Sequence, residues 1–449
     1  MEADLPKESD LDLLNEALDQ GDPGTAEALI RDMHASEVAL ALESLPQAQR
    51  DVVWGLVEED DSGDVLAELN DEVRSGLLED MDTAELRAAT EGMELDVLAD
   101  VVADLPEDKT TELIDSLDDE ERERLEVVLS FPEDTAGGLM NPATISVRRY
   151  YALEHVLDNL RRDAELPDNT LSIFVIDRNE RYVGSVSLTK LLTSSPQQLV
   201  EEVMDTRISG ITADTSATEV AQLFQDKDLV TAPVIDDDGR LIGQITVDDV
   251  VDVIREQADH EILGKAGLDE EDDIFAPVTT SARRRAVWLG INLATAFLAA
   301  AVVGMFEATL AQLVILAVLM PVVASMGGIA GTQTLTLMVR SMALGRVNDS
   351  NARWLMMKEF MIGVLNGLVW AVVVGIITVT FFSGPEIALL IAAAVALNLI
   401  IAAIAGFLVP VILQRINIDP AIAGGVVLTT VTDVVGFASF LGLGAIFLT

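Results

Sequence analysis

Five long apolar runs follow one another in the C-terminal part of the chain. Four contain no charged residue and the fifth contains only Asp433, and they cover residues 286–306, 308–339, 360–385, 387–414 and 420–449. About 20 helical residues are needed to cross the ~30 Å hydrocarbon core of a bilayer. Because each run reaches that length, we predict an α-helical transmembrane domain of five spans over residues 281–449.

Basic residues mark alternate ends of these runs. They precede the first run, separate the second from the third, and precede the fifth, at Arg283, Arg284, Arg285, Arg340, Arg346, Arg353, Lys358 and Arg415. The connections near Glu307 and residues 383–385 carry none. Since Lys and Arg are enriched in cytoplasmic loops, we expect a multi-pass protein of the cell membrane, in contact with lipid. Its N-terminus and regulatory domains would be cytoplasmic and its C-terminus outside.

Residues 1–130 show the period of short amphipathic helices. Apolar residues recur three and four positions apart, as in Leu113, Ile114 and Leu117, and polar phrases separate the segments. This spacing places the apolar side chains on one face of each helix. It predicts an all-α N-terminal domain in which short helices form an array.

After Met140 the apolar period changes to two, and an internal repeat appears at a lag of 59 residues. Each copy reads as helix, strand, turn, strand and helix, an α/β pattern. The repeat resembles a tandem pair of CBS domains, which implies a regulatory module. The first domain, with the linker that precedes it, would cover residues 131–202 and the second residues 203–256, so the whole chain is multidomain.

The second copy contains a possible nucleotide motif. Residues 243–249 resemble the pattern in which a Thr and an Asp, here Thr246 and Asp249, hold adenine nucleotides such as ATP in many CBS proteins. The first copy departs from it, with Ser187 and Lys190 at the matching positions. The alternative is a helix N-cap formed by Thr246 or Asp248. An acidic amphipathic helix then follows within residues 249–280 and connects the sensor to the first span.

Charge is divided unevenly between the two parts of the chain. Residues 281–449 contain six acids and eight bases, so residues 1–280 contain the other 70 acids and 20 bases, a net charge near −50. Such a surface repels nucleic acid and favours cations as partners. A salt-rich host is the alternative reason for this acidity. The absence of cysteine excludes disulfides and thiolate metal sites, and the first residues lack the basic and apolar segments of a signal peptide.

Asp433 is the one acid within the apolar runs, and it has no basic residue within two helical turns. A carboxylate in the membrane is costly unless it pairs or faces water, which makes it a functional candidate. Thr429, four residues earlier, lies on the same helix face. We infer that a transported cation supplies the missing charge; the alternative is a protonated carboxyl group hydrogen-bonded between helices.

Two further motifs have ordinary explanations. Asp419 followed by Pro420 is a common helix start, although Asp419 is also a candidate metal ligand. The stretch 327–333, Gly-Gly-Ile-Ala-Gly-Thr-Gln, indicates either a broken helix or close helix packing, and we favour packing.

Taken in order, these features resemble the MgtE magnesium channel family along essentially the whole chain. The resemblance is carried by residues 131–140, 327–333, 419–421 and 429–437. It implies a homodimer that conducts Mg2+ inward through a pore lined by the paired fifth helices. Asp433 of each subunit would bind hydrated Mg2+, and Asp419 would bind a second ion at the cytoplasmic mouth.

The resemblance also implies that cytosolic Mg2+ closes the pore by bridging acidic surfaces of the N-terminal domain, the CBS pair and the connecting helix. The matching residues here are Asp96, Asp100, Gly137, Asp228, Asp249, Asp252 and Glu261. The chain departs from the family pattern at five positions, namely Thr218, Gln257, His260, Ile329 and Gly425. These departures affect the sensor more than the surroundings of Asp433.

The alternatives to a Mg2+ channel are a secondary transporter, a channel for other divalent ions and an enzyme. A secondary transporter could exchange Mg2+ or Co2+ for protons at Asp433, with nucleotide regulation through the CBS pair. Selectivity for Zn2+ is disfavoured by the absence of Cys and the oxygen-rich lining. An enzyme is disfavoured because the three histidines, His34, His155 and His260, are scattered and we find no nucleophile and base in a recognisable motif.

Overall fold

The computed structural model describes residues 8–162, 170–268, 273–348, 350–382 and 384–448. The chain forms two compact units. The first contains Met1–Gln257 and Glu271–Ala276, and the second contains Ala258–Glu270 and Pro277–Thr449. We call them the soluble unit and the membrane unit.

The soluble unit begins with an array of short helices, as the apolar period predicts. No strand interrupts the described residues before Ser146. Polar residues cap the starts of several helices. For example, the Asp82 carboxylate accepts hydrogen bonds from the Ala84 and Glu85 amides, and the Glu85 carboxylate accepts one from the Asp82 amide. The elements are α1 (Glu8–Gln20), α2 (Pro23–Asp32), α3 (Ala35–Glu43), α4 (Gln47–Trp54), η1 (Glu59–Asp61), α5 (Ser62–Glu68), α6 (Asp71–Asp80), α7 (Thr83–Thr90), α8 (Leu95–Asp104), α9 (Glu107–Ser116) and α10 (Asp119–Leu129).

Two small sheets of the same design follow. In each, a short strand pairs in parallel with a second, which pairs antiparallel with a third. The first sheet contains β1 (Ser146–Arg148), β2 (Ser172–Ile176) and β3 (Tyr182–Ser187), and the second contains β4 (Ile211–Thr212), β5 (Thr231–Ile235) and β6 (Leu241–Thr246). The helices are α11 (Leu153–Arg162), α12 (Leu188–Thr193), α13 (Val200–Val203), α14 (Ala217–Lys227) and α15 (Val247–Leu263).

The predicted repeat is confirmed strand by strand. β5 and β6 begin and end 59 residues after β2 and β3, and the register shift in each hairpin recurs at the same place, after Val175 and after Val234. The two copies also pair with each other, because the Tyr182 amide donates to the Gly239 carbonyl and the Leu241 amide donates to the Glu180 carbonyl. The sequence missed only the short leading strands β1 and β4.

The linker after α10 associates with the second copy rather than the first. The Gly137 amide donates to the Ala213 carbonyl at 2.9 Å, and Asn141 exchanges backbone hydrogen bonds with Gln244. The sequence had grouped this linker with the first CBS domain. As a result, the N-terminal helices and the second copy share one apolar core.

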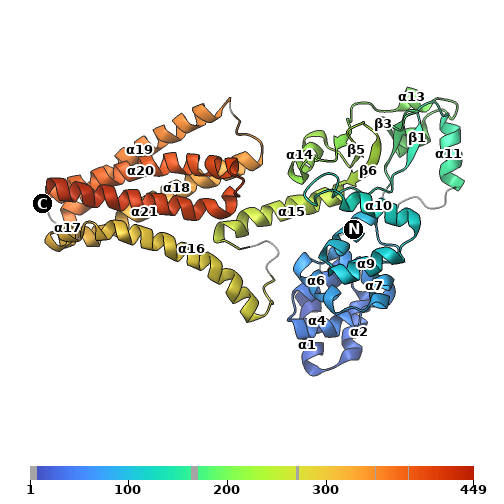
Figure 1. The fold of residues 1–449 in the computed structure, drawn as a ribbon, viewed down its shortest axis with the longest axis horizontal. Coiled ribbons are helices and arrows are strands. Elements are labelled where there is room, and N and C mark those ends of the chain that lie inside the picture. The colour runs from blue at the N-terminus through green and yellow to red at the C-terminus, as the bar shows by residue number, and fades with distance from the viewer. Residues whose placement is uncertain (1–7, 163–169, 269–272, 349, 383, 449) are drawn as a thin grey trace. The chain divides into compact units, whose positions relative to one another are not determined.

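The membrane unit contains five helices long and apolar enough to cross a bilayer among the described residues. They are α16 (Val278–Gly304), α18 (Val314–Ala343), α19 (Ala352–Phe381), α20 (Pro385–Arg415) and α21 (Pro420–Phe447). In Figure 1, α16 diverges from α21 toward its N-terminal end. The second apolar run differs from the prediction at its start. Residues Glu307–Gln312 form a separate short helix, α17, and the span begins only at Val314.

Helix α20 forms the centre of this bundle and packs against α18, α19 and α21. Glycines allow the close contacts, because a Cβ atom at Gly406 would lie 2.7 Å from the carbonyl oxygen of Gly331. Gly331 belongs to the 327–333 stretch. Helix α18 continues unbroken through that stretch, so the packing interpretation is confirmed.

Candidate pore groove and acidic cluster

Asp433 lies at the midpoint of α21, the fourteenth of its 28 residues. The start of this helix is fixed by Asp419, whose carboxylate accepts a hydrogen bond of 2.6 Å from the Ala421 amide, and by Pro420 at the first position. The helix-cap interpretation of Asp419 is therefore confirmed. The cap sets the depth at which Asp433 lies in the bundle.

Asp433 and Thr429 line a cavity of about 890 Å³ between α21 and α18. We call this cavity the pore groove. Its α18 side presents Ala324, Ser325, Gly328, Ile329, Thr332, Gln333, Thr336 and Leu337. The shared face of Asp433 and Thr429 agrees with their i,i+4 spacing. The polar groups of α18 were missed as site residues, although four hydroxyl or amide side chains in a membrane helix were a visible signal.

The Asp433 carboxylate is half-buried and makes no hydrogen bond or ion pair within the part of the chain that the structure describes. The neighbouring hydroxyls of Thr430 and Thr432 do not donate to this carboxylate, because each donates to a backbone carbonyl instead. Thr430 donates to the Val426 carbonyl at 2.7 Å, and Thr432, fully buried, donates to the Thr429 carbonyl at 3.0 Å. Of Thr429, Thr430 and Thr432, only Thr429 is among the residues that line the groove.

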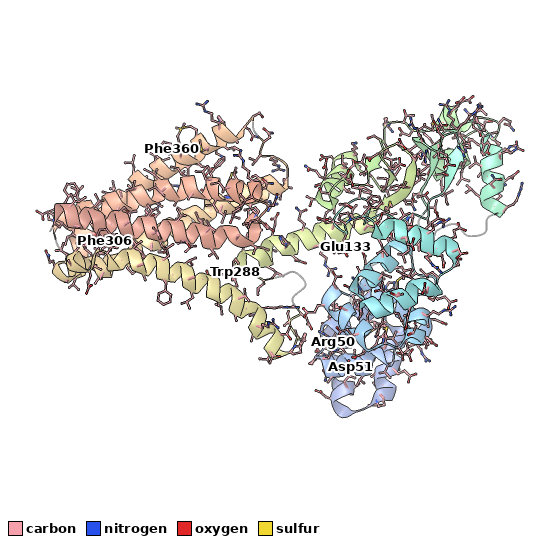
Figure 2. The ribbon with its side chains drawn as sticks, viewed as in Figure 1. Arg50, Asp51, Glu133, Trp288, Phe306 and Phe360 are labelled. Carbon is pink, nitrogen blue, oxygen red and sulfur yellow. The ribbon has the colours of Figure 1, made fainter. Side chains whose placement is uncertain are left out.

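The end of α15 and the 3-10 turn η2 (Gly264–Ala266) pack against the start of α21 within the membrane unit. His260 is hydrogen-bonded to Asp419 through its Nε2 atom, and Gly264 lies against Ile422. Gly267 follows with a left-handed backbone (φ +71°), and a Cβ there would overlap the Trp288 ring of α16, which Figure 2 labels. The histidine that replaces an expected acid therefore contacts Asp419 directly.

A second polar site lies inside the soluble unit, where α8 meets the second CBS copy. Asp96 is 9 % exposed, and its charged neighbours are Asp249 and Glu94. The Asn141 amide nitrogen donates to Glu94 at 2.8 Å and to Asp96 at 3.4 Å. We call Glu94, Asp96, Asn141 and Asp249 the acidic cluster. Glu94 and Asn141 were missed, because their sequence positions do not reveal the contact between domains.

Burial, followed by the negative charges of Asp249 and Glu94, raises the pKa of Asp96 from 3.8 to about 7. Burial also raises the pKa of Asp249 to about 6, although hydrogen bonds from Thr246 oppose the shift. Concentrated carboxylates of this kind gain from a bound cation, which would replace the missing solvation of their charges.

Thr246 and Asp249 contact each other. One Asp249 carboxylate oxygen accepts hydrogen bonds from the Thr246 amide at 2.9 Å and from its hydroxyl at 2.8 Å. This arrangement stabilises the first turn of α15. Thr246 stands at the helix start, as in the N-cap alternative, but here the side chain that accepts the hydrogen bonds is Asp249 and not Thr246 or Asp248.

The remaining candidates are dispersed. Asp100 is exposed on α8 and has Arg74, Asp71 and Glu133 as charged neighbours, a different environment from that of Asp96. Asp228 is exposed and ends α14 with a left-handed backbone, φ 51°. The other three lie on the linker and on α15: Gly137 against the Phe131 ring, Asp252 exposed, and Glu261 partly buried in the membrane unit. Among the described residues, no three or more His, Cys, Asp or Glu side chains are grouped closely enough to hold a metal ion, and this includes the three carboxylates of the acidic cluster.

The fold and these two sites define a multi-pass membrane protein that carries a carboxylate in a polar groove and is joined to a CBS-type regulatory region. Comparison with known proteins identifies its family. The chain matches the MgtE model, described as a divalent cation transporter, over residues 320–443, the MgtE intracellular N domain over residues 33–134, and a CBS domain over residues 200–256.

Relatives extend the match to the full length. The magnesium transporter MgtE of Thermus thermophilus is 30 % identical over 97 % of this chain and 98 % of its own, and that of Bacillus subtilis is 27 % identical over 94 % and 93 %. The chain belongs to the MgtE family. A solved structure of the cytosolic domain of the Mg2+ channel MgtE in complex with ATP is 34 % identical, covers 54 % of this chain and 99 % of its own, and gives a TM-score of 0.49.

Proposed function

We propose that this protein is a Mg2+ channel that conducts the ion inward past Asp433. The observation that carries the proposal is the pore groove, in which a carboxylate with no counter-charge among the described residues shares the cavity with hydroxyl and amide groups of α18. The names of the relatives, which are magnesium transporters, support the choice of ion.

The groove suits a hydrated ion better than a bare one. Mg2+ binds six oxygens in a tight octahedron and loses water reluctantly, so a site with few carboxylates must contact it through water. Asp433 supplies charge, while Thr429 and the polar side chains of α18 can accept hydrogen bonds from the water shell. Selection then depends on the size of the hydrated ion and on the spacing of these groups.

A single chain supplies one side of the conduction path, and we propose that a second copy completes it. In the expected homodimer the two α21 helices face each other and bring two Asp433 carboxylates to one axis. Gly425 supports this arrangement, because a Cβ atom there would meet nothing within 4 Å of the same chain. A surface of small residues allows two membrane helices to approach closely.

For regulation, we propose that cytosolic Mg2+ bridges the acidic cluster and closes the pore. Asp96 and Asp249 come from different domains, so a cation between them stabilises the closed arrangement of the soluble unit. Mg2+ must then bind the closed form more tightly than the open form. Asp100, Gly137, Asp228, Asp252 and Glu261 belong to the same proposal as further contributors, and Asp419 to a second ion site at the cytoplasmic mouth.

ATP is proposed as a regulatory ligand at Thr246 and Asp249. A bound nucleotide would compete for the hydrogen bonds that these residues make with each other. Titration with millimolar ATP should raise the thermal unfolding temperature of the purified protein. The absence of any shift would remove ATP from the account and leave conduction unaffected.

The first prediction concerns Asp433→Ala. Without the carboxylate nothing in the groove offsets the charge of the dication, so Mg2+ uptake into proteoliposomes should fall by about tenfold or more. Glu386→Ala, which removes an exposed acid at the start of α20, is the matched control and should transport normally. Unchanged uptake by Asp433→Ala would overturn the pore assignment.

A secondary transporter is the competing proposal. A channel passes current that reverses at the Mg2+ equilibrium potential, whereas a proton-coupled exchanger responds to the pH gradient. Currents that follow the pH gradient would replace the channel by the exchanger while keeping Asp433 as the ion-binding residue.

A further inference from the structure

Asn398 is a buried polar side chain in the centre of the membrane unit. It belongs to α20 and is 0 % exposed. Its Nδ2 atom donates a hydrogen bond of 2.9 Å to the Val323 carbonyl of α18. Its Oδ1 atom has no hydrogen-bond partner among the described residues. A buried oxygen without a partner costs free energy, so an apolar residue would pack this position more stably.

The space for Asn398 is provided by two glycines on the two helices that line the pore groove. A Cβ atom at Gly436 of α21 would lie 2.8 Å from the Asn398 amide nitrogen, and one at Gly327 of α18 would overlap that amide. Real Cβ atoms essentially never approach another heavy atom within 3.0 Å. Asn398, Gly327 and Gly436 therefore pack together at one level of the bundle, where α20, α18 and α21 meet.

This level coincides with the ion site. Gly436 follows Asp433 by three residues, less than one helical turn, and Gly327 precedes the groove-lining Gly328. Asn398 packs against Gly327 of α18 and Gly436 of α21 and is not among the residues that line the groove. Its size sets how far apart α18 and α21 lie, and its hydrogen bond fixes the position of α18.

We propose that Asn398 is a positioning residue that sets the width of the pore groove and thereby its discrimination between hydrated Mg2+ and Ca2+. The inference rests on the proposed ion-binding role of Asp433. Asn398 does not contact the ion. It holds the α18 polar groups at the distance from Asp433 that an intact Mg2+ water shell requires.

Asn398→Ala is the first test, with Mg2+ and Ca2+ uptake measured separately in proteoliposomes. The smaller side chain no longer fixes the spacing of α18 and α21, so Mg2+ uptake should stay within about threefold of wild type while the Mg2+/Ca2+ ratio falls by about threefold or more. A residue with only a structural role would lower both uptakes together. An unchanged ratio would overturn the inference.

Gly436→Ala provides the second test, because its methyl group has no room beside Asn398. Mg2+ uptake should fall by about tenfold, and the double variant Gly436→Ala/Asn398→Ala should recover to within about threefold of wild type. Gly375→Ala, where a Cβ makes only ordinary contacts of 3.7 Å or more, is the control. Additive losses in the double variant would overturn the inference. If Gly436→Ala does not fold, the Asn398→Ala ratio decides alone.

Failure of this inference is distinguishable from failure of the proposed function. Normal uptake by Asp433→Ala would defeat the pore assignment whatever Asn398 does. An unchanged ion ratio in Asn398→Ala, together with loss of uptake in Asp433→Ala, would remove the positioning role and leave the pore in place.

Discussion

Asp433 and Asp96 are both partly withdrawn from water, but their surroundings differ. Asp433 faces hydroxyl and amide groups of α18, whereas Asp96 faces the carboxylates of Glu94 and Asp249. The first arrangement can hold a water shell around a passing ion. The second raises the energy of the empty site, which is why we propose that a bound cation acts there as a switch.

The raised pKa of Asp96 gives a prediction for stability. The unfolded chain releases this proton near pH 3.8 and the folded chain only near pH 7, so the folded state binds more protons between those values. Without Mg2+, stability should fall as pH rises through that window and then level off. Asp96→Asn should raise the unfolding free energy at pH 7.5 by as much as about 4 kcal/mol.

Thermal unfolding of the purified full chain checks this prediction. Asp96→Asn should also lose part of the stabilisation that wild type gains from Mg2+, because one of the carboxylates proposed to bridge the ion is gone. Asp51→Asn, an exposed change on α4, is the control. If wild type and Asp96→Asn showed the same dependence of stability on pH, the buried Asp96 carboxyl group would not be the cause of that dependence.

The position of a site residue could be predicted from the sequence only where it depends on the residue's own helix. The i,i+4 spacing of Thr429 and Asp433 and the cap at Asp419 are properties of one helix, and each is found as expected. Glu94, Asn141 and the α18 groups depend on contacts between distant segments. A single sequence does not specify those contacts.

Among the secondary-structure elements, strands β2, β3, β5 and β6 could be predicted from the 59-residue repeat, because apolar residues alternate with a period of two in each copy. The short strands β1 and β4 offer too few residues to show a period. Helix α17 could not be predicted as a separate helix, because the chain remains apolar across the turn that follows it. The turn lies at Leu313, whose backbone leaves the helical region (φ −128°, ψ 70°).

The segment that leads toward α16 is held on the N-terminal helices by a buried ion pair. The Arg50 guanidinium, labelled in Figure 2, donates to both carboxylate oxygens of Asp273 at 2.6 and 2.9 Å, and the two side chains are 3 % and 5 % exposed. The Asp273 amide donates to Glu72 at 2.6 Å. The connector is therefore anchored on α4 and α6.

Arg50→Met should destabilise the soluble unit by about 3–5 kcal/mol, because it leaves the Asp273 carboxylate buried without a partner. It should also expose residues 273–276 to protease in the full chain. The double variant Arg50→Met/Asp273→Leu should recover much of the loss. Arg31→Met, at an exposed pair with Glu58, should cost less than about 1 kcal/mol. Equal effects at the two sites would contradict the anchoring.

The whole chain has a net charge of −48. Repulsion among its negative charges should oppose the compact arrangement of the soluble unit that we propose for the closed state. Millimolar Mg2+ should raise its unfolding temperature and slow proteolysis far more than NaCl at the same ionic strength, because bridging needs a dication and screening does not. Equal protection by NaCl would identify the acidity as an adaptation to salt. Chelation of Mg2+ should reverse the effect.

We propose above that a hydrated dication neutralises Asp433 in the groove. Mn2+, which also binds oxygen ligands, can be located by its anomalous X-ray scattering in crystals of the protein. We predict a peak beside Asp433, separated from its carboxylate oxygens by room for a water molecule, and no peak in Asp433→Asn. An empty groove at saturating Mn2+, or an Asp433 side chain paired with a basic residue, would contradict the account.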